Sequence, residues 1–168
     1  LGLAGFTASL ASAPRALDLD GDGRLDRLYQ LDITGSLWRF DFESGATVGQ
    51  LARARRIARL GTGAQRFFAT PDASLTRLEG TLRLTLAVGS GWLTRPRDTS
   101  TVDRAYVLFD REPPGSTRVL TESDLHDSTE AEGPMPAAAP GWLLRLARHG
   151  RGEKVIGPTL TFDRALWL

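Results

Sequence analysis

Residues 28–42 read Leu-Tyr-Gln-Leu-Asp-Ile-Thr-Gly-Ser-Leu-Trp-Arg-Phe-Asp-Phe, and they contain the clearest fold signal of the chain. In the second half of this segment Leu37, Arg39 and Asp41 face one way and aromatic residues face the other, which is the period-two pattern of a strand. The central Asp-Ile-Thr-Gly has the residue types of a turn. The segment therefore predicts an antiparallel hairpin.

Other short segments show the same kind of signal. Further strands are expected at 56–60, 66–70, 81–89, 105–110, 142–147, 154–156, 159–162 and 165–168. The 18 Gly and 9 Pro punctuate the chain at short intervals, and sustained helical periodicity is scarce. The chain is therefore expected to be mainly β, with short antiparallel strands forming a sandwich, barrel or propeller.

Two stretches are less regular. Residues 51–60 fit either a strand or a basic amphipathic helix, and their arginines are Arg53, Arg55, Arg56 and Arg59. Thr121 with an acid three residues later resembles a capping box, so a short helical insertion is expected near 121–127. Polar and Ala/Pro-rich residues follow, so that a surface insertion is expected over about 121–140.

A weak internal repeat supports a propeller in particular. The apolar strand that ends at Asp41 is echoed by 106–110 and by 160–163, and each copy is closed by Asp. A strand-plus-Asp unit at irregular spacing of this kind suits the repeated blades of a propeller.

The overall composition excludes several classes of protein. The 168 residues carry a net charge of +1, which provides no global field for nucleic acid or an anionic membrane. The absence of Cys removes disulfides, zinc–thiolate sites and thiol catalysis. No stretch approaches the 18 consecutive apolar residues of a membrane span. The chain begins without Met and ends in an apolar run, so residues 1–168 are expected to be a single fragment of a larger protein.

The stretch just before the hairpin, residues 18–26, reads Asp-Leu-Asp-Gly-Asp-Gly-Arg-Leu-Asp and has calcium-loop spacing. Calcium takes six to eight oxygen ligands, which carboxylates at alternate positions of a tight loop can supply. The expected ligands are Asp18, Asp20, Asp22, Asp26 and the backbone carbonyl of Arg24. Gly23 lies at the sixth position, where a sharp turn is needed. The competing interpretation is a solvated acidic turn without a metal.

The loop differs from an EF-hand in one important respect. Its twelfth position is Tyr29 instead of a bidentate Glu, and the residues that follow look like a strand. Without that Glu, the expected affinity is roughly 10⁻⁶ to 10⁻³ M, and the expected role is structural.

Other candidate sites have simpler explanations. His126 and His149 lie in polar contexts and are expected to be solvated. The arginines of 53–59 could contact nucleic acid or anionic lipid, but a solvated strand face is favoured over both. No arrangement of Ser, His and Asp with catalytic spacing is visible, so no catalytic residue is expected.

Taken together, these motifs resemble the C-terminal domain of the PilY/PilC-type family of type IV pilus-tip adhesins and biogenesis factors. The matching segments, in the order of the family, are the loop and strand at 16–41, then 89–107, 120–125, 141–146 and 152–163. The series runs from about residue 16 to the end of the chain, and it is more specific than any single piece.

The resemblance implies a modified, quinoprotein-like β-propeller at the cell surface or pilus tip, with the loop acids as calcium ligands. It also implies minor pilins as partners, a possible host or surface receptor, and roles in pilus biogenesis, adhesion and twitching motility. The chain holds too few strands to close a ring of at least four blades.

Two other classes remain open. A calcium-stabilised carbohydrate- or matrix-binding surface module would share the site and the location but differ in partner. A quinone-dependent dehydrogenase on the same kind of propeller would use calcium to hold its cofactor, and the local clustering of the loop acids argues against it.

Overall fold

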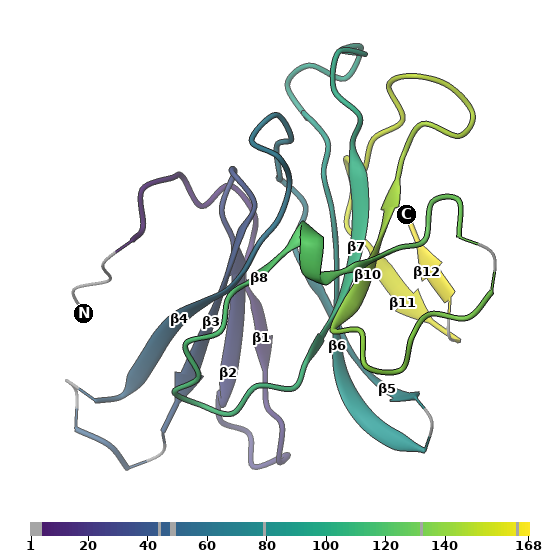
Figure 1. Ribbon diagram of the computed structural model, residues 1–168. Helices are drawn as coiled ribbons and strands as arrows, with labels where there is room; N and C mark the ends of the chain where they lie inside the picture. The colour runs from purple at the N-terminus through teal and green to yellow at the C-terminus, as the bar shows by residue number, and fades with distance from the viewer. Residues whose placement is uncertain (1–4, 44, 48–49, 79, 132, 164) are drawn as a thin grey trace.

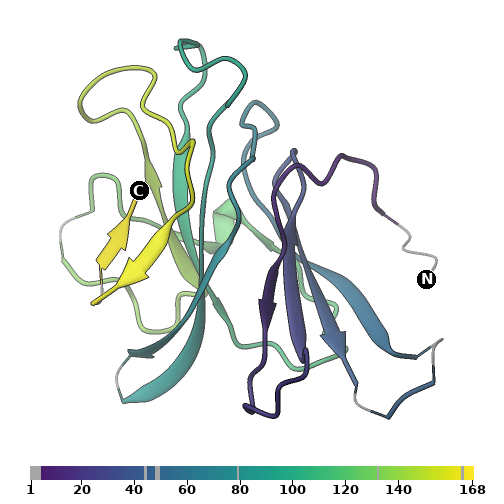
Figure 2. The ribbon, with the colours of Figure 1, turned by 180° about the vertical axis from the view of Figure 1, so that it is seen from behind.

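The computed structural model describes residues 5–43, 45–47, 50–78, 80–131, 133–163 and 165–168. Its described part is mainly β and rich in antiparallel pairs, and its sheets form no closed barrel. Two five-stranded sheets stand side by side, and a small hairpin lies on the outer side of the second sheet (Figure 1; Figure 2 shows the reverse side). The mainly β fold expected from the sequence is therefore confirmed.

The first sheet is formed largely by the N-terminal third of the chain. Its order is β1 (Arg15–Leu17), β2 (Arg27–Leu31), β3 (Ser36–Phe42), β4 (Ala52–Arg59) and β8 (Leu120–Thr121). The expected hairpin is β2–β3. The ambiguous segment at 51–60 is a strand, because it pairs along the whole length of β3, from Ser36↔Arg59 to Phe42↔Ala52.

The second sheet repeats this plan of antiparallel strands with a short parallel strand at one edge. Its order is β5 (Asp72–Leu78), β6 (Thr81–Gly89), β7 (Arg104–Asp110), β10 (Gly141–Arg145) and β9 (His126–Asp127). The strands expected at 81–89 and 105–110 are β6 and β7. The strand expected at 66–70 is not formed, and β5 follows it instead, because β5 has a partner in β6. The segment expected at 154–156 is likewise not a strand.

The third element is the hairpin of β11 (Leu160–Phe162) and β12 (Ala165–Trp167). It is tied to the second sheet by the Thr161 N–H, which donates to Asp72 Oδ2 at 2.7 Å, and by the Thr159 hydroxyl, which donates to the Ala87 carbonyl at 3.1 Å. Leu166 of this hairpin packs with Val107 and Phe109 on the outer face of the second sheet.

The short helical insertion expected near 121–127 is not seen. The chain makes a single 3-10 turn over Glu122–Asp124, between the two-residue strands β8 and β9. Because β8 pairs with β4 and β9 pairs with β10, residues 120–127 connect the two sheets and leave no room for a longer helix. Leu125 in this crossing is 8% exposed and belongs to the core.

The main core fills the space between the two sheets. Its buried members come from both, and the largest are Tyr29, Leu31, Leu37, Leu60, Phe67, Leu86, Tyr106 and Leu108. The turn between β2 and β3 contacts this core closely. Gly35 has φ +95°, and a Cβ there would lie 2.3 Å from the Leu60 carbonyl oxygen, so only glycine fits.

Candidate metal centre

The acidic loop is the connection between β1 and β2, at the lower end of the first sheet in Figure 1. Backbone hydrogen bonds fix where it enters and leaves the sheet. The Asp26 N–H donates to the Leu17 carbonyl at 3.0 Å, and the Phe42 N–H donates to the Asp26 carbonyl at 2.8 Å. A loop with both ends held in a sheet has little freedom to unwind, so its side chains stay close together.

Three of the predicted ligands converge. One carboxylate oxygen from each of Asp18, Asp20 and Asp22 lies within 4.8 Å of the others, and all three residues are exposed. Gly23 adopts φ +83°, which allows the chain to turn back at the sixth position, as expected. The loop thus presents a cluster of hard oxygen donors to solvent, and this is the ligand type that calcium prefers.

The carboxylates also shape the loop by accepting its backbone N–H groups. Asp18 accepts from Gly21 at 2.6 Å and from Gly23 at 2.8 Å, and Asp22 accepts from Arg24 at 2.8 Å. The hydrogen bonds from Gly23 and then Gly21 hold the pKa of Asp18 below its usual value, because they favour the charged form. Each carboxylate oxygen has two lone pairs, so these bonds leave acceptor capacity for a cation.

The other two predicted ligands are placed differently. Asp26 is half-buried, and its Oδ2 accepts the Leu19 N–H at 2.6 Å, which joins the two ends of the loop. The Arg24 side chain lies 3.9 Å from Asp22 Oδ2 and is 70% exposed. The residues therefore fit a cation site with three converging carboxylates. Ligation by Asp26 and by the Arg24 carbonyl stays a prediction.

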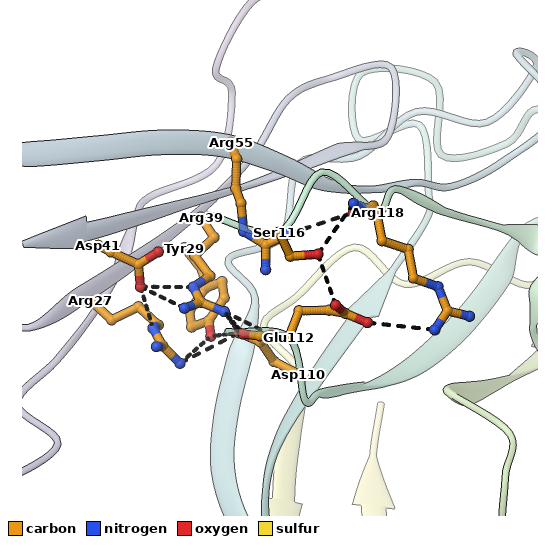
Figure 3. A network of polar contacts seen from close by, with 9 residues as sticks. All are labelled: Arg27, Tyr29, Arg39, Asp41, Arg55, Asp110, Glu112, Ser116 and Arg118. Carbon is orange, nitrogen blue, oxygen red and sulfur yellow. Dashed lines mark hydrogen bonds and ion pairs between the residues drawn. The ribbon is translucent and has the colours of Figure 1, made fainter. Parts of the chain in front are cut away.

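A second polar cluster lies between the sheets, and the sequence did not predict it. We call Arg27, Tyr29, Arg39, Asp41 and Asp110 the inter-sheet ion network (Figure 3). Its centre is the fully buried Arg39, which lies 2.7 Å from Asp41 Oδ1 and 3.0 Å from Asp110 Oδ1. Arg27 lies 2.9 Å from Asp41 Oδ1 and 3.5 Å from Asp110 Oδ2, and the Tyr29 hydroxyl donates to Asp110. Since Asp110 ends β7, this network joins the second sheet to the first immediately after the acidic loop.

A related contact joins the second sheet to the connection between the sheets. Arg104 and Tyr106 of β7 both reach Glu122, with Arg104 Nε 3.2 Å from Glu122 Oε1 and the Tyr106 hydroxyl donating to the same oxygen. Both arrangements start from the sequence Asp-Arg-x-Tyr, at 26–29 and at 103–106. This repeated tetrapeptide is the sequence signal that could have indicated the two cross-sheet contacts.

These features define a class of protein: a mainly β domain of paired sheets with an exposed acidic loop of metal-ligand type. Comparison with known proteins narrows the class. The crystal structure of the Pseudomonas aeruginosa PilY1 C-terminal domain matches with a TM-score of 0.71 at 23% identity, covering 91% of this chain and 42% of that one. The "Type IV pilus biogenesis factor PilY1 homolog" of Xylella fastidiosa is 28% identical over an alignment of 144 residues, which covers 79% of this chain. No protein-family model matches.

The chain is therefore similar in sequence and in fold to a PilY1-type C-terminal domain, as its motifs indicated. It spans 11% of the length of the Xylella relative. Within the described residues, the structure contains no helix with the length and apolar character needed to cross a membrane.

Proposed function

We propose that this chain is a calcium-binding, non-enzymatic module of a type IV pilus biogenesis factor and adhesin. The observation that carries the proposal is the convergence of Asp18, Asp20 and Asp22 in a loop anchored to a sheet, within a fold like that of the PilY1 C-terminal domain. The role of the whole protein in type IV pilus biogenesis extends this proposal from the name of the Xylella relative, and a place at the pilus tip and a role in twitching motility extend it from the family resemblance of the motifs.

The two sheets are proposed to be neighbouring blades of a modified propeller. Each contains four strands in antiparallel succession, β1–β4 in one and β5, β6, β7 and β10 in the other, which is the make-up of a blade. They pack face to face through one core, and the β11–β12 hairpin packs on the outer face of the second sheet, where a third blade would begin.

Calcium in the loop is proposed to be structural. It would be held by Asp18, Asp20 and Asp22, with Asp26 and the Arg24 carbonyl completing the oxygen set. Because Arg27 follows the loop directly and contacts Asp41 and Asp110, an ordered loop would also fix the start of the inter-sheet ion network.

The calcium proposal is tested by thermal melting with calcium and then with chelator. A ligand that binds the native state at about 100 times its Kd adds about 2.7 kcal/mol to the free energy of unfolding. Asp20→Ala should melt like the chelated protein and should not respond to calcium. The matched control is Glu130→Ala, which removes an exposed carboxylate far from the loop in sequence and should respond like the unaltered chain. An unchanged melting temperature of the unaltered chain at millimolar calcium contradicts the proposal.

The pilus role needs a different readout. The isolated domain, loaded with calcium, is expected to capture minor pilins in a pull-down. Binding to glycans or matrix components on an array, without capture of pilins, would instead favour a carbohydrate- or matrix-binding module. Cofactor absorbance or dye-linked oxidation of alcohols would overturn the non-enzymatic assignment.

A further inference from the structure

A pocket lined by arginines lies at the edge of the first sheet. It has a volume of about 410 Å³, and its walls are Trp38 and Asp41 of β3, residues 53–56 of β4, and residues 115–117 of the segment that leads to β8. This volume lies in the range of small-ligand pockets. Neither the acidic loop nor the proposed pilus role uses this pocket.

The charges around the pocket do not balance. The inter-sheet ion network continues next to the pocket into Arg55, Glu112 and Arg118 (Figure 3), which makes four arginines with three carboxylates, and of these Asp41 and Arg55 line the pocket itself. Arg27 and Arg39 contact Asp41 and Asp110, and Arg118 lies 3.5 Å from Glu112 Oε1. Arg55 is the fourth arginine, and it forms no ion pair with any residue that the structure describes. The cluster therefore carries one positive charge in excess, at Arg55.

The donors of Arg55 are also unsatisfied. Its Nε and Nη2 are buried and have no hydrogen-bond partner among the described residues, and its Nη1 makes one long contact of 3.5 Å with the Arg118 carbonyl. Leaving a buried donor unpaired is unfavourable, and more so for a charged group. Burial, followed by the nearby charge of Arg39, lowers the pKa of Arg55, since both disfavour its charged form.

The pattern of free donors indicates what is missing. Nε and Nη2 lie on the same edge of the guanidinium and form the planar fork that binds carboxylate, sulfate or phosphate through two parallel hydrogen bonds. The adjacent Arg56 also has a buried, unpartnered Nε, and its guanidinium lies 5.5 Å from the centre of the Trp38 ring. Arg55 pairs with Arg39 and Arg56 with Trp38, so their side chains lie on opposite faces of β4, and the fork of Arg55 is the group that an oxyanion would use.

We propose that this pocket binds an oxyanion, namely the carboxylate, sulfate or phosphate group of a small ligand, through the Nε–Nη2 fork of Arg55. The fork is buried in this structure, so binding requires a neighbouring segment to move; the segment 115–117 borders the pocket, and its Gly115 and Thr117 are exposed. A small ligand fits better than a polyanion, because residues 115–117 bound the pocket and the net charge of the chain is +1. The proposal is independent of calcium and of the pilus.

The test measures binding and melting with sodium sulfate, sodium phosphate and sodium glucuronate, against sodium chloride at the same ionic strength. Glucose serves as the uncharged control for glucuronate. A rise in melting temperature with sulfate or phosphate shows that a free tetrahedral anion is sufficient for binding in the pocket. A response to glucuronate, without one to glucose, identifies a sugar acid.

Three variants make the result specific. Arg55→Gln should lose at least tenfold in affinity, and Arg55→Lys should lie between it and the unaltered chain because lysine keeps the charge but not the fork. Arg59→Gln removes an exposed charge from the same strand, outside the pocket, and should bind like the unaltered chain.

A second readout separates a binding role from a structural one. In chloride buffer Arg55→Gln should melt at or above the temperature of the unaltered chain, because it removes an unneutralised buried charge beside Arg39. A lower melting temperature would assign Arg55 a structural role and overturn the proposal. Equal oxyanion affinity in Arg55→Gln, or no preference for oxyanions over chloride, would overturn it as well.

Discussion

The two Asp-Arg-x-Tyr segments share three of their four residues, but the carboxylates of their aspartates have different partners. Asp26 and Asp103 each lie immediately before a strand, and each backbone carbonyl accepts an N–H at 2.8 Å, from Phe42 and from Leu146 respectively. The arginine and tyrosine that follow then reach a carboxylate outside their own sheet, which is Asp110 of β7 in the first case and Glu122 of the connection between the sheets in the second. The backbone framework is thus shared, and the difference lies in what neutralises the acid.

In the second segment the cation is part of the protein. Asp103 is 2% exposed, accepts the Ser90 hydroxyl at 2.7 Å, and has Lys154 Nζ 3.6 Å from its Oδ2. Lys154 also donates to the Asp98 carbonyl, and its side chain is 5% exposed. In the first segment Asp26 is half-buried and accepts the Leu19 N–H. It closes a loop in which Asp18, Asp20 and Asp22 are exposed and the mostly exposed Arg24 lies beside Asp22. A buried acid needs a permanent partner, whereas an exposed acidic cluster can take its cation from solvent.

Lys154→Met should have the largest effect on stability. Methionine keeps an unbranched apolar chain but removes the charge, and it leaves Asp103 buried without a cation. Breaking a buried ion pair in this way costs about 3–5 kcal/mol of unfolding free energy, which urea denaturation measures.

Arg151→Met is the matched control, because this arginine is exposed in the same loop and its loss should change stability by no more than about 0.5 kcal/mol. A chelator should destabilise Lys154→Met and the unaltered chain by the same amount, since the two cation sites are independent. Equal stability of the two Met variants would refute the role of Lys154.

The sequence predicted those parts of the structure that depend on patterns of neighbouring residues. The β2–β3 hairpin and β6 were readable from alternation, and the acidic loop from the spacing of its aspartates. The strand β5 was not, because Asp72–Leu78 is a polar segment that becomes a strand through its pairing with β6. Arginines 55 and 56 were expected on a solvated face, yet both are half-buried, because Arg55 lies beside the buried Arg39 and Arg56 lies over the Trp38 ring.

The cross-sheet contacts escaped prediction for a related reason. Tyr29 and Asp110 are separated by 81 positions, and no local period links them. The strand-plus-Asp repeat did identify Asp41 and Asp110 as similar positions, but not that one buried arginine would join them. Long-range charge pairing depends on the packing of the two sheets, which the local pattern does not contain.

The two tyrosines provide a smaller and sharper comparison. Tyr→Phe keeps the ring and removes one hydrogen bond to a carboxylate, a type of bond worth about 1.5–3 kcal/mol. Tyr106→Phe should cost about 2 kcal/mol, because Glu122 retains only Arg104 and the Gly61 N–H as partners among the described residues. Tyr29→Phe should cost about 1 kcal/mol, because Asp110 keeps both Arg27 and Arg39. Urea denaturation of both variants measures the two losses of unfolding free energy. A larger loss in Tyr29→Phe than in Tyr106→Phe would contradict the idea that Arg27 and Arg39 compensate at Asp110.

The ionisation of these tyrosines has the smallest effect on stability near neutral pH, but it should lower stability measurably at high pH. Burial first, and then the charge of Asp110, raises the pKa of Tyr29, whereas burial and the hydrogen bond to Glu122 raise the pKa of Tyr106. A raised folded-state pKa means that the folded chain keeps protons which the unfolded chain releases above about pH 10. The stabilisation is therefore complete below about pH 10 and is lost as the pH rises further, by up to about 1.4 kcal/mol per pH unit for each tyrosine.

These are the two tyrosines of the whole chain, so tyrosinate absorbance reports on both cross-sheet contacts and on nothing else. We expect that absorbance to stay low in the folded chain above about pH 10 and to appear together with unfolding. The double variant Tyr29→Phe/Tyr106→Phe should lose stability less steeply over the same pH range, because its remaining alkaline titration comes from other groups. Tyrosinate that forms gradually near pH 10, while the chain stays folded, would show that these hydroxyls reach solvent and that the sheets separate more readily than the two contacts imply.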